Sequence, residues 1–325
     1  MDLSCAFAPS MDTPDHVALA EQLGYRRAWL YDSPALYPDV WMSLARAADR
    51  TSTIGLGPAV LVPSLRHPMV NAAAIATLAA QAPGRTAVAV GSGFTGRMVL
   101  GQRPMRWSDV ADYVRALRGL LRGEDVEWDG KVLRMLQLPD FGHERPIDVP
   151  ILIGAGGPKG LEVARDLGDG IFSAGALQAA ESPWHALLVF GTVVDDGEDV
   201  SSPRVLAAAG PGLVVALHGT WEWAGPEAVD GFPGGKAWRT AIEAEPAESR
   251  YLAVHEGHLV ALNDRDQAAI GELSSLLTAF GISGTAAEVR AKADGFAAAG
   301  VTELVFQPSG PDIRRELEAM MEALG

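Results

Sequence analysis

The sequence contains a single cysteine, Cys5, so the chain cannot form an intrachain disulfide bond. Cys5 lies in an apolar run, which favours a small buried side chain over a nucleophile. No apolar run reaches the length that a bilayer-spanning helix needs, and the N-terminus lacks the basic and apolar regions of a secretory signal. We therefore expect no membrane segment and a cytoplasmic protein.

Positive charge is also scarce, because 26 Lys and Arg residues stand against 41 Asp and Glu residues, for a net charge of −15. Nucleic acids and anionic membranes attract proteins with basic surfaces, so the charge argues against either as a partner. Backbone amides and one or two cations could still hold a small anionic ligand. The composition therefore predicts a globular protein with a small-molecule partner.

Apolar strand-like segments alternate with helical segments along most of the chain. Repeated strand–helix units with apolar strands are typical of a parallel sheet covered on both faces. Eight such strands predict an α/β fold of the (β/α)8 TIM-barrel type, with a doubly wound sheet as the structural alternative. The predicted strands are 3–9, 26–32, 53–62, 86–91, 151–154, 171–174, 185–195 and 303–307, and the predicted helices are 13–23, 39–50, 68–81, 108–121 and 159–167.

The segment between the last two predicted strands does not fit this repeating unit. About residues 200–282 read as helical or irregular, with a stretch rich in tryptophan, glycine and proline. We expect one domain over residues 1–325, with this insertion forming a lid or substrate pocket. The connection after the sixth strand is short, which leaves the sixth barrel helix in doubt.

Two glycine-rich segments follow predicted strands. In GAGGPKG, residues 154–160, a strand enters four glycines, a proline and a lysine before a helix begins. That pattern suits either a phosphate cradle at a helix N-terminus or a plain tight turn, and it is not a nucleotide-binding P-loop. VGSGFTGR, residues 90–97, has the same strand-to-glycine pattern. Because both strand ends would face the same barrel mouth, the pair predicts one large ligand lying across it.

Several polar residues are candidates for chemistry. Asp32 ends the second predicted strand, where it would act on a ligand or cap the next segment. Arg66 and His67 precede Pro68 at a helix start. His255 and His258 are three residues apart, but no carboxylate or cysteine completes a familiar zinc pattern. The sequence therefore favours no metal, and a metal-dependent hydrolase built on these two histidines is a minor alternative.

Several longer stretches together carry a family resemblance. GPAVLVPSLRHPMVNAAAIATLAAQAPGR, AVAVGSG, GEDVEWDGKVLRM, VPILIGAGGPKGLEVARDLGDGIF and GTAAEVRAKADGFAAAGVTELVFQP resemble, in order and spacing, the luciferase-like monooxygenase superfamily. The resemblance covers about residues 25–308, and the middle third is most similar to methylenetetrahydromethanopterin reductases. It implies a (β/α)8 barrel with insertions, often dimeric, that uses reduced FMN or the 5-deazaflavin coenzyme F420.

The resemblance also implies a cofactor site. In the reductase branch a non-prolyl cis peptide bond bulges against the deazaflavin ring, and by position it falls at Ala59-Val60. The glycine run after residue 153 would take the cofactor phosphate, and Asp32 would lie near the polar edge of the ring. The implied cofactor residues are Asp32, Ala59, Val60, Gly91, Ser92, Gly93, Gly154, Ala155, Gly156, Gly157, Gly175 and Ala176.

Two departures separate the chain from the sugar-phosphate and alcohol dehydrogenases of this family. Ser33 stands where those enzymes carry a catalytic histidine, and Phe94 stands where they carry a glutamate. We expect an F420-dependent oxidoreductase that moves a hydride between the cofactor and a small organic substrate, with an FMN-dependent monooxygenase or a non-catalytic deazaflavin-binding protein as alternatives. Candidates for proton handling are Asp32, Ser33 and His255, and candidates for substrate contact are Phe7, Trp41, Phe94, Trp221 and His255.

Overall fold

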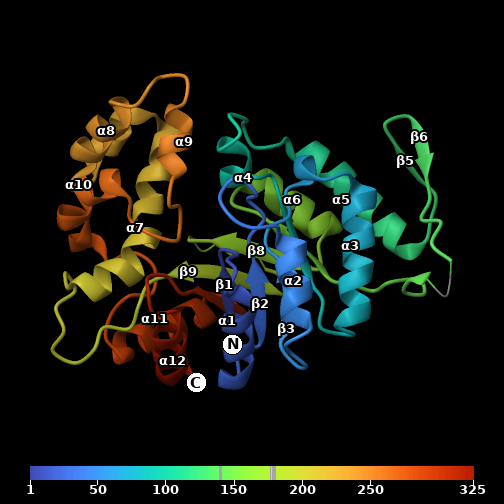
Figure 1. Ribbon diagram of the computed structural model, residues 1–325, viewed down its shortest axis with the longest axis horizontal. Coiled ribbons are helices and arrows are strands. Elements are labelled where there is room, and N and C mark those ends of the chain that lie inside the picture. The colour runs from blue at the N-terminus through green and yellow to red at the C-terminus, as the bar shows by residue number, and fades with distance from the viewer. Residues whose placement is uncertain (139–140, 176, 178–180) are drawn as a thin grey trace.

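The computed structural model describes residues 1–138, 141–175, 177 and 181–325. Eight parallel strands form one sheet in the order β3-β2-β1-β10-β9-β8-β7-β4. The strands lie at the centre of the molecule in Figure 1. All eight agree with predicted strands, although several are shorter. Their bounds are β1 Asp2–Phe7, β2 Arg27–Leu30, β3 Gly55–Pro58, β4 Val88–Gly91, β7 Ile151–Gly154, β8 Gly170–Ala174, β9 His185–Phe190 and β10 Glu303–Gln307.

The sheet closes on itself where β3 meets β4. Parallel bridges join Leu56 to Thr86 and Leu61 to Val90. The Leu61 N–H donates to the Ala89 carbonyl oxygen at 2.7 Å. A doubly wound sheet would leave both edge strands open, so the closure excludes that alternative. The (β/α)8 barrel prediction is confirmed.

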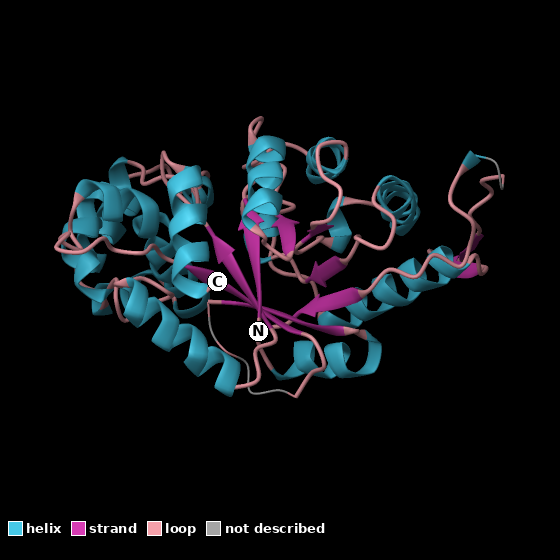
Figure 2. Ribbon diagram, turned by 90° about the horizontal axis from the view of Figure 1, so that it is seen from below, coloured by secondary structure: helices cyan, strands magenta, loops and turns pink. Residues whose placement is uncertain are grey.

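Helices surround the strands, as the end-on view of Figure 2 shows. The helix predicted at 68–81 has those bounds, because His67 caps its first turn through Nδ1 and Pro68 suits the first helical position. Among the described residues between β8 and β9 there is no helix, at the connection whose short length left the sixth barrel helix in doubt. The surrounding helices are α1 Thr13–Leu23, α2 Val40–Ala48, α3 Pro68–Gln81, α4 Phe94–Met98, α5 Trp107–Arg122, α6 Pro158–Leu167, α11 Ala286–Ala298 and α12 Ile313–Leu324.

Side chains fill the barrel at the amino ends of its strands. Trp29 packs edge-on against Phe172, with ring centroids 5.4 Å apart. Its indole N–H donates to Glu303 at 3.0 Å, and Trp184 donates to the other oxygen of the same carboxylate. Both carboxylate oxygens of Glu303 therefore accept a hydrogen bond although the residue is buried. This packing leaves the carboxyl ends of the strands as the end that can receive a ligand.

The insertion has a hydrophobic core of its own, centred on Trp238, Val254 and Leu273. Its elements lie to the left of the barrel in Figure 1, coloured yellow to orange. They are α7 Pro203–Ala224, the 3₁₀ helix Pro226–Gly231, α8 Gly235–Glu243, α9 Arg250–His255, α10 Asp264–Leu273 and the 3₁₀ helix Ser274–Leu276. A separate antiparallel hairpin consists of β5 Val126–Trp128 and β6 Lys131–Leu133, with its turn at Asp129 and Gly130. Among the described helices, none combines the length and apolar character that a membrane crossing requires.

We expect the Glu198 carboxylate, just before α7, to make the free energy of unfolding depend on pH. Arg204 and Ser202 donate to the Glu198 carboxylate, and these bonds lower its pKa to about 2 from a usual 4.5. Glu198→Gln should therefore lower the free energy of unfolding at pH 7 by about 1 kcal/mol. Because the depressed pKa stabilises the fold only above the unfolded value, the difference should shrink as the pH falls from 4.5 toward 2. Urea unfolding at pH 7, 4 and 3 measures it, and a pH-independent difference would contradict this account.

Candidate active site

A pocket of about 640 Å³ lies at the carboxyl ends of the barrel strands. Eleven of the twelve implied cofactor residues line it, although they come from five separate strand ends. Ala176 lies outside the described residues. The lining residues from the implied set are Asp32, Ala59, Val60, Gly91, Ser92, Gly93, Gly154, Ala155, Gly156, Gly157 and Gly175.

Val60 forms one wall of the pocket. The Ala59-Val60 peptide bond is cis, which confirms that expectation. A Cβ atom added at Gly91 would lie 2.7 Å from Val60 Cγ2, and one added at Gly154 would lie 2.6 Å from Val60 Cγ1. Real Cβ atoms do not approach other atoms so closely. Gly91 and Gly154 are therefore glycines because the Val60 side chain packs between their strands.

Gly156 and Gly157 have a different environment. A Cβ atom added at either position meets no atom within 4 Å. Gly157 is the N-cap of α6 with φ −171°, an extended conformation open to any residue, and Gly156 is not in the left-handed region either. The turn itself therefore does not require glycine at these two positions. Since the first N–H groups of a helix lack partners within it, the arrangement leaves room for an anion at the start of α6.

Asp32 is held by an arginine at the edge of the pocket. Its side chain is 1% exposed and accepts from Arg66 Nη1 at 2.6 and 2.7 Å. Arg66 Nη2 also donates to Asp39 at 2.7 Å. Burial raises the pKa of Asp32, while the hydrogen bonds from Arg66 oppose that rise. The pair joins residues 34 positions apart, and the sequence offered no local signal for it.

Aromatic rings cover the outer side of the pocket. Phe94, a predicted substrate contact, lines it and stacks on Trp223 with centroids 5.5 Å apart. Trp221, also a predicted contact, instead packs against Trp238 in the core of the insertion. Residues two positions apart in a helix are rotated by about 200° about its axis, so Trp221 and Trp223 point to opposite sides of α7. Trp223 therefore lines the pocket, and the predicted Trp221 does not.

Two further predicted substrate contacts do not lie among the residues that line the pocket. Phe7 packs among the surrounding helices and stacks on His16 of α1. Side chains alternate along a strand, and Ala6 takes the inward position on β1. Trp41 lies on α2 and donates to Asn71 of α3 at 2.9 Å. Neither side chain points toward the inside of the barrel, so the structure does not bring Phe7 or Trp41 to the pocket.

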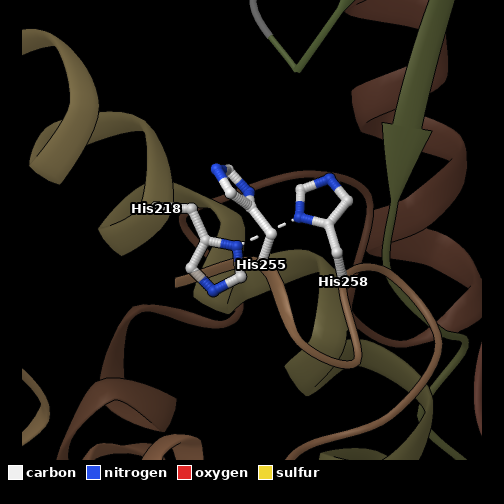
Figure 3. A group of neighbouring side chains, drawn as sticks. All are labelled: His218, His255 and His258. Carbon is white, nitrogen blue, oxygen red and sulfur yellow. Dashed lines mark hydrogen bonds between the residues drawn. The ribbon is translucent and has the colours of Figure 1, made fainter. Parts of the chain in front are cut away.

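Three buried histidines lie together beside the pocket (Figure 3). His218 comes from α7, His255 ends α9, and His258 lies in the turn that follows. His218 Nδ1 and His258 Nδ1 are 3.0 Å apart. Burial lowers the pKa of His258 to about 3 and that of His218 well below its usual value, so both rings are neutral.

Of these three, His258 lines the pocket and its Nε2 lies 3.2 Å from Thr95 Oγ1. His255, predicted to touch the substrate, instead meets the Phe94 ring edge-on with centroids 5.9 Å apart. Its Nε2 lies 3.3 Å from a Glu222 oxygen. Ser33, the remaining candidate for proton handling, lines the pocket. The sequence missed His218, because 40 residues separate it from His258.

The packing of Val60 on Gly91 gives a direct test of the pocket wall. Gly91→Ala should destabilise the protein by about 1–3 kcal/mol, because the new methyl group overlaps Val60. In a Val60→Ala background the same change should cost much less, since the overlapping methyl groups are gone. Gly156→Ala, which meets no atom within 4 Å, is the matched control. Equal losses from Gly91→Ala in both backgrounds, measured by urea unfolding, would contradict the account.

Two sequence relatives of known function match this chain. Over 98% of its length the chain is 28% identical to the 5,10-methylenetetrahydromethanopterin reductase of Archaeoglobus fulgidus, covering 97% of that protein. Over half of its length it is 32% identical to the F420-dependent glucose-6-phosphate dehydrogenase of Beutenbergia cavernae, covering 52% of that protein. Both relatives are oxidoreductases.

A solved structure has the same overall fold. The coenzyme F420-dependent tetrahydromethanopterin reductase from Methanopyrus kandleri superposes with a TM-score of 0.68 at 19% identity. The match covers 99% of this chain and 98% of the other. Residues 8–303 also match the sequence profile of a family described as luciferase-like monooxygenase. The chain therefore belongs to the luciferase-like monooxygenase family and is an enzyme of that kind.

Proposed function

We propose that the protein is an F420-dependent oxidoreductase that acts on a small organic substrate. The observation that carries the proposal is the single pocket in which the Val60 wall and the start of α6 face the same space. A flat ring system with a phosphate-bearing tail matches these two features. The F420 dependence named for the Beutenbergia cavernae relative supports this cofactor over FMN.

The residues present fit such a cofactor. A Cβ atom added at Gly156 or Gly157 would have no protein atom within 4 Å, so the space beside these residues is free. The two glycines and the first backbone amides of α6 would hold the phosphate there. Val60, Gly91 and Gly154 would hold the ring. When bound, the deazaflavin supplies a carbon that accepts or donates a hydride. The protein would orient the substrate and exclude water from the space between the two.

Asp32 takes a positioning role in this proposal. Its carboxylate accepts two hydrogen bonds from Arg66, which hold it in place at the pocket edge. Ser33 follows it in the chain, lines the pocket and carries a hydroxyl that would exchange a proton with a ligand. His255 would act on the substrate only through its neighbours, since it does not line the pocket. His258 is the histidine that faces it.

The substrate side of the pocket is apolar. Phe94 stands where the resemblance assigns a glutamate to the sugar-phosphate enzymes, and its ring stacks on Trp223. Leu188, Phe190 and Val215 extend this wall. We therefore propose an uncharged substrate with an apolar face rather than a sugar phosphate. We further propose a homodimer, as the resemblance implies, which light scattering of the purified protein would test.

Parallel titrations with oxidised and reduced F420 and FMN, followed by fluorescence, test the proposal. F420 should bind at least ten times more tightly than FMN, and reduced F420 should be oxidised in the presence of an apolar carbonyl or olefin substrate. Oxygen consumption with reduced FMN alone would instead identify a monooxygenase. F420 binding without turnover of any compound in a substrate panel would identify a non-catalytic binding protein.

A further inference from the structure

The histidines beside the pocket are unusual in their mutual contact. His218, His255 and His258 are all buried, and one ring nitrogen from each lies within 4.8 Å of the others. Figure 3 shows the three rings turned toward one another, from α7, the end of α9 and the following turn. Imidazole is the side chain that most often binds transition metals, and a neutral ring is the form that binds.

The distances in the cluster are close to those that a metal ion imposes. A tetrahedral Zn²⁺ binds histidine nitrogen at about 2.0–2.1 Å, so two such nitrogens lie about 3.3 Å apart. His218 Nδ1 and His258 Nδ1 are 3.0 Å apart. The third ring is near enough to join them after a small rotation. Little movement is therefore needed to form a three-histidine site.

Two ring nitrogens of the cluster lack a partner in the described part of the chain, and two others face polar side chains. His255 Nδ1 and His218 Nε2 are buried and have no hydrogen-bond partner among the described residues. His255 Nε2 faces Glu222, which lies one turn beyond His218 on α7. His258 Nε2 faces Thr95. Metal-binding histidines commonly donate their second nitrogen to such a partner, which fixes the ring for coordination.

We propose that His218, His255 and His258 form a binding site for a divalent transition-metal ion of the zinc class. The ion would join α7 to the turn after α9 and would hold the insertion against the pocket. Three protein ligands leave one tetrahedral position for water. The chemistry of the donor set favours Zn²⁺, Co²⁺ or Ni²⁺ over Mg²⁺ or Ca²⁺, which prefer oxygen. The inference does not depend on the proposed function.

The experiment uses the full chain without an affinity tag. The purified protein is measured by elemental analysis as isolated and after incubation with Zn²⁺ and desalting, and about one ion per chain is expected. Co²⁺ in place of Zn²⁺ should give the visible absorption of a tetrahedral site. After a chelator has removed any bound metal, Zn²⁺ at a hundredfold excess over its Kd should raise the melting temperature by about 4 °C.

Variants locate the ion. His255→Gln should remove both the stoichiometric metal and the metal-induced rise in melting temperature. Glu222→Gln should weaken metal binding about 10- to 100-fold, because it removes only the carboxylate behind His255. His143→Ala, at an exposed histidine, is the matched control and should behave as the unmodified protein.

Two results would overturn the proposal, and neither needs a folded variant. The first is less than a tenth of an ion per chain in the unmodified protein, both as isolated and after incubation. The second is an unchanged melting temperature when saturating Zn²⁺ is added to the unmodified protein after a chelator has removed any bound metal. Retention of the metal by a folded His255→Gln variant would also overturn it. F420 titrations run on the same samples keep this outcome separate from any failure of the proposed function.

Discussion

Gly157→Asp is expected to weaken cofactor binding about 10- to 100-fold while leaving the fold intact. The side chain fits, because Gly157 is extended and a Cβ atom there meets nothing within 4 Å. Aspartate is also a favoured N-cap, so α6 should be as stable as before or slightly more so. A carboxylate at the start of α6 would instead repel the cofactor phosphate by about 1–3 kcal/mol. Fluorescence titration with F420 measures the loss.

The matched control is Gly157→Asn, which has the same shape and capping ability without the charge. It should bind the cofactor within about threefold of the unmodified protein. Equal losses in the Asp and Asn variants would show that bulk, not charge, is responsible. Unchanged affinity in the Asp variant would mean that the GAGGPKG segment serves only as a connection between β7 and α6.

Arg66→Met is expected to cause the largest loss of stability, about 3–5 kcal/mol. The substitution preserves much of the side-chain volume but leaves the Asp32 carboxylate buried without its partner. Burial already raises the pKa of Asp32, and the loss of Arg66 should raise it further. The variant should therefore take up a proton at Asp32 on folding and lose stability as the pH increases. Urea unfolding between pH 5 and 8 measures both effects.

Two further variants distinguish the contribution of the buried Asp32–Arg66 pair from that of Asp39. Asp39→Asn removes the more exposed carboxylate, whose side chain is 40% exposed, and keeps a good N-cap for α2. It should cost less than about 1 kcal/mol. The Asp32→Asn/Arg66→Met double variant should recover part of the loss, since no buried charge remains. A similar loss for Asp39→Asn and Arg66→Met would contradict the assignment.

Much of the barrel could be predicted from short stretches of the chain. Helix 68–81 begins at His67-Pro68 and ends before Pro83-Gly84, signals that are read within a few residues. The strands that end at Gly91 and Gly154 point to one mouth because parallel strands share a direction. Their glycines therefore indicated the edge where the pocket lies. The reason each is a glycine, the close approach of Val60, was not visible in the sequence.

The orientation of single side chains and the long-range contacts depended on the folded chain. Trp221 and Trp223 differ in sequence position by two, yet the rotation of α7 sends one into a core and the other to the pocket. Asp32 and Arg66 meet because β2 and the segment before α3 end at the same mouth. His218 reaches His258 only through packing of the insertion. The sequence alone thus determined the helices, the strands and the direction of the strands, because backbone propensity acts over a few residues. The partners of single side chains were decided by the tertiary structure, because they depend on helix rotation and on packing between distant segments.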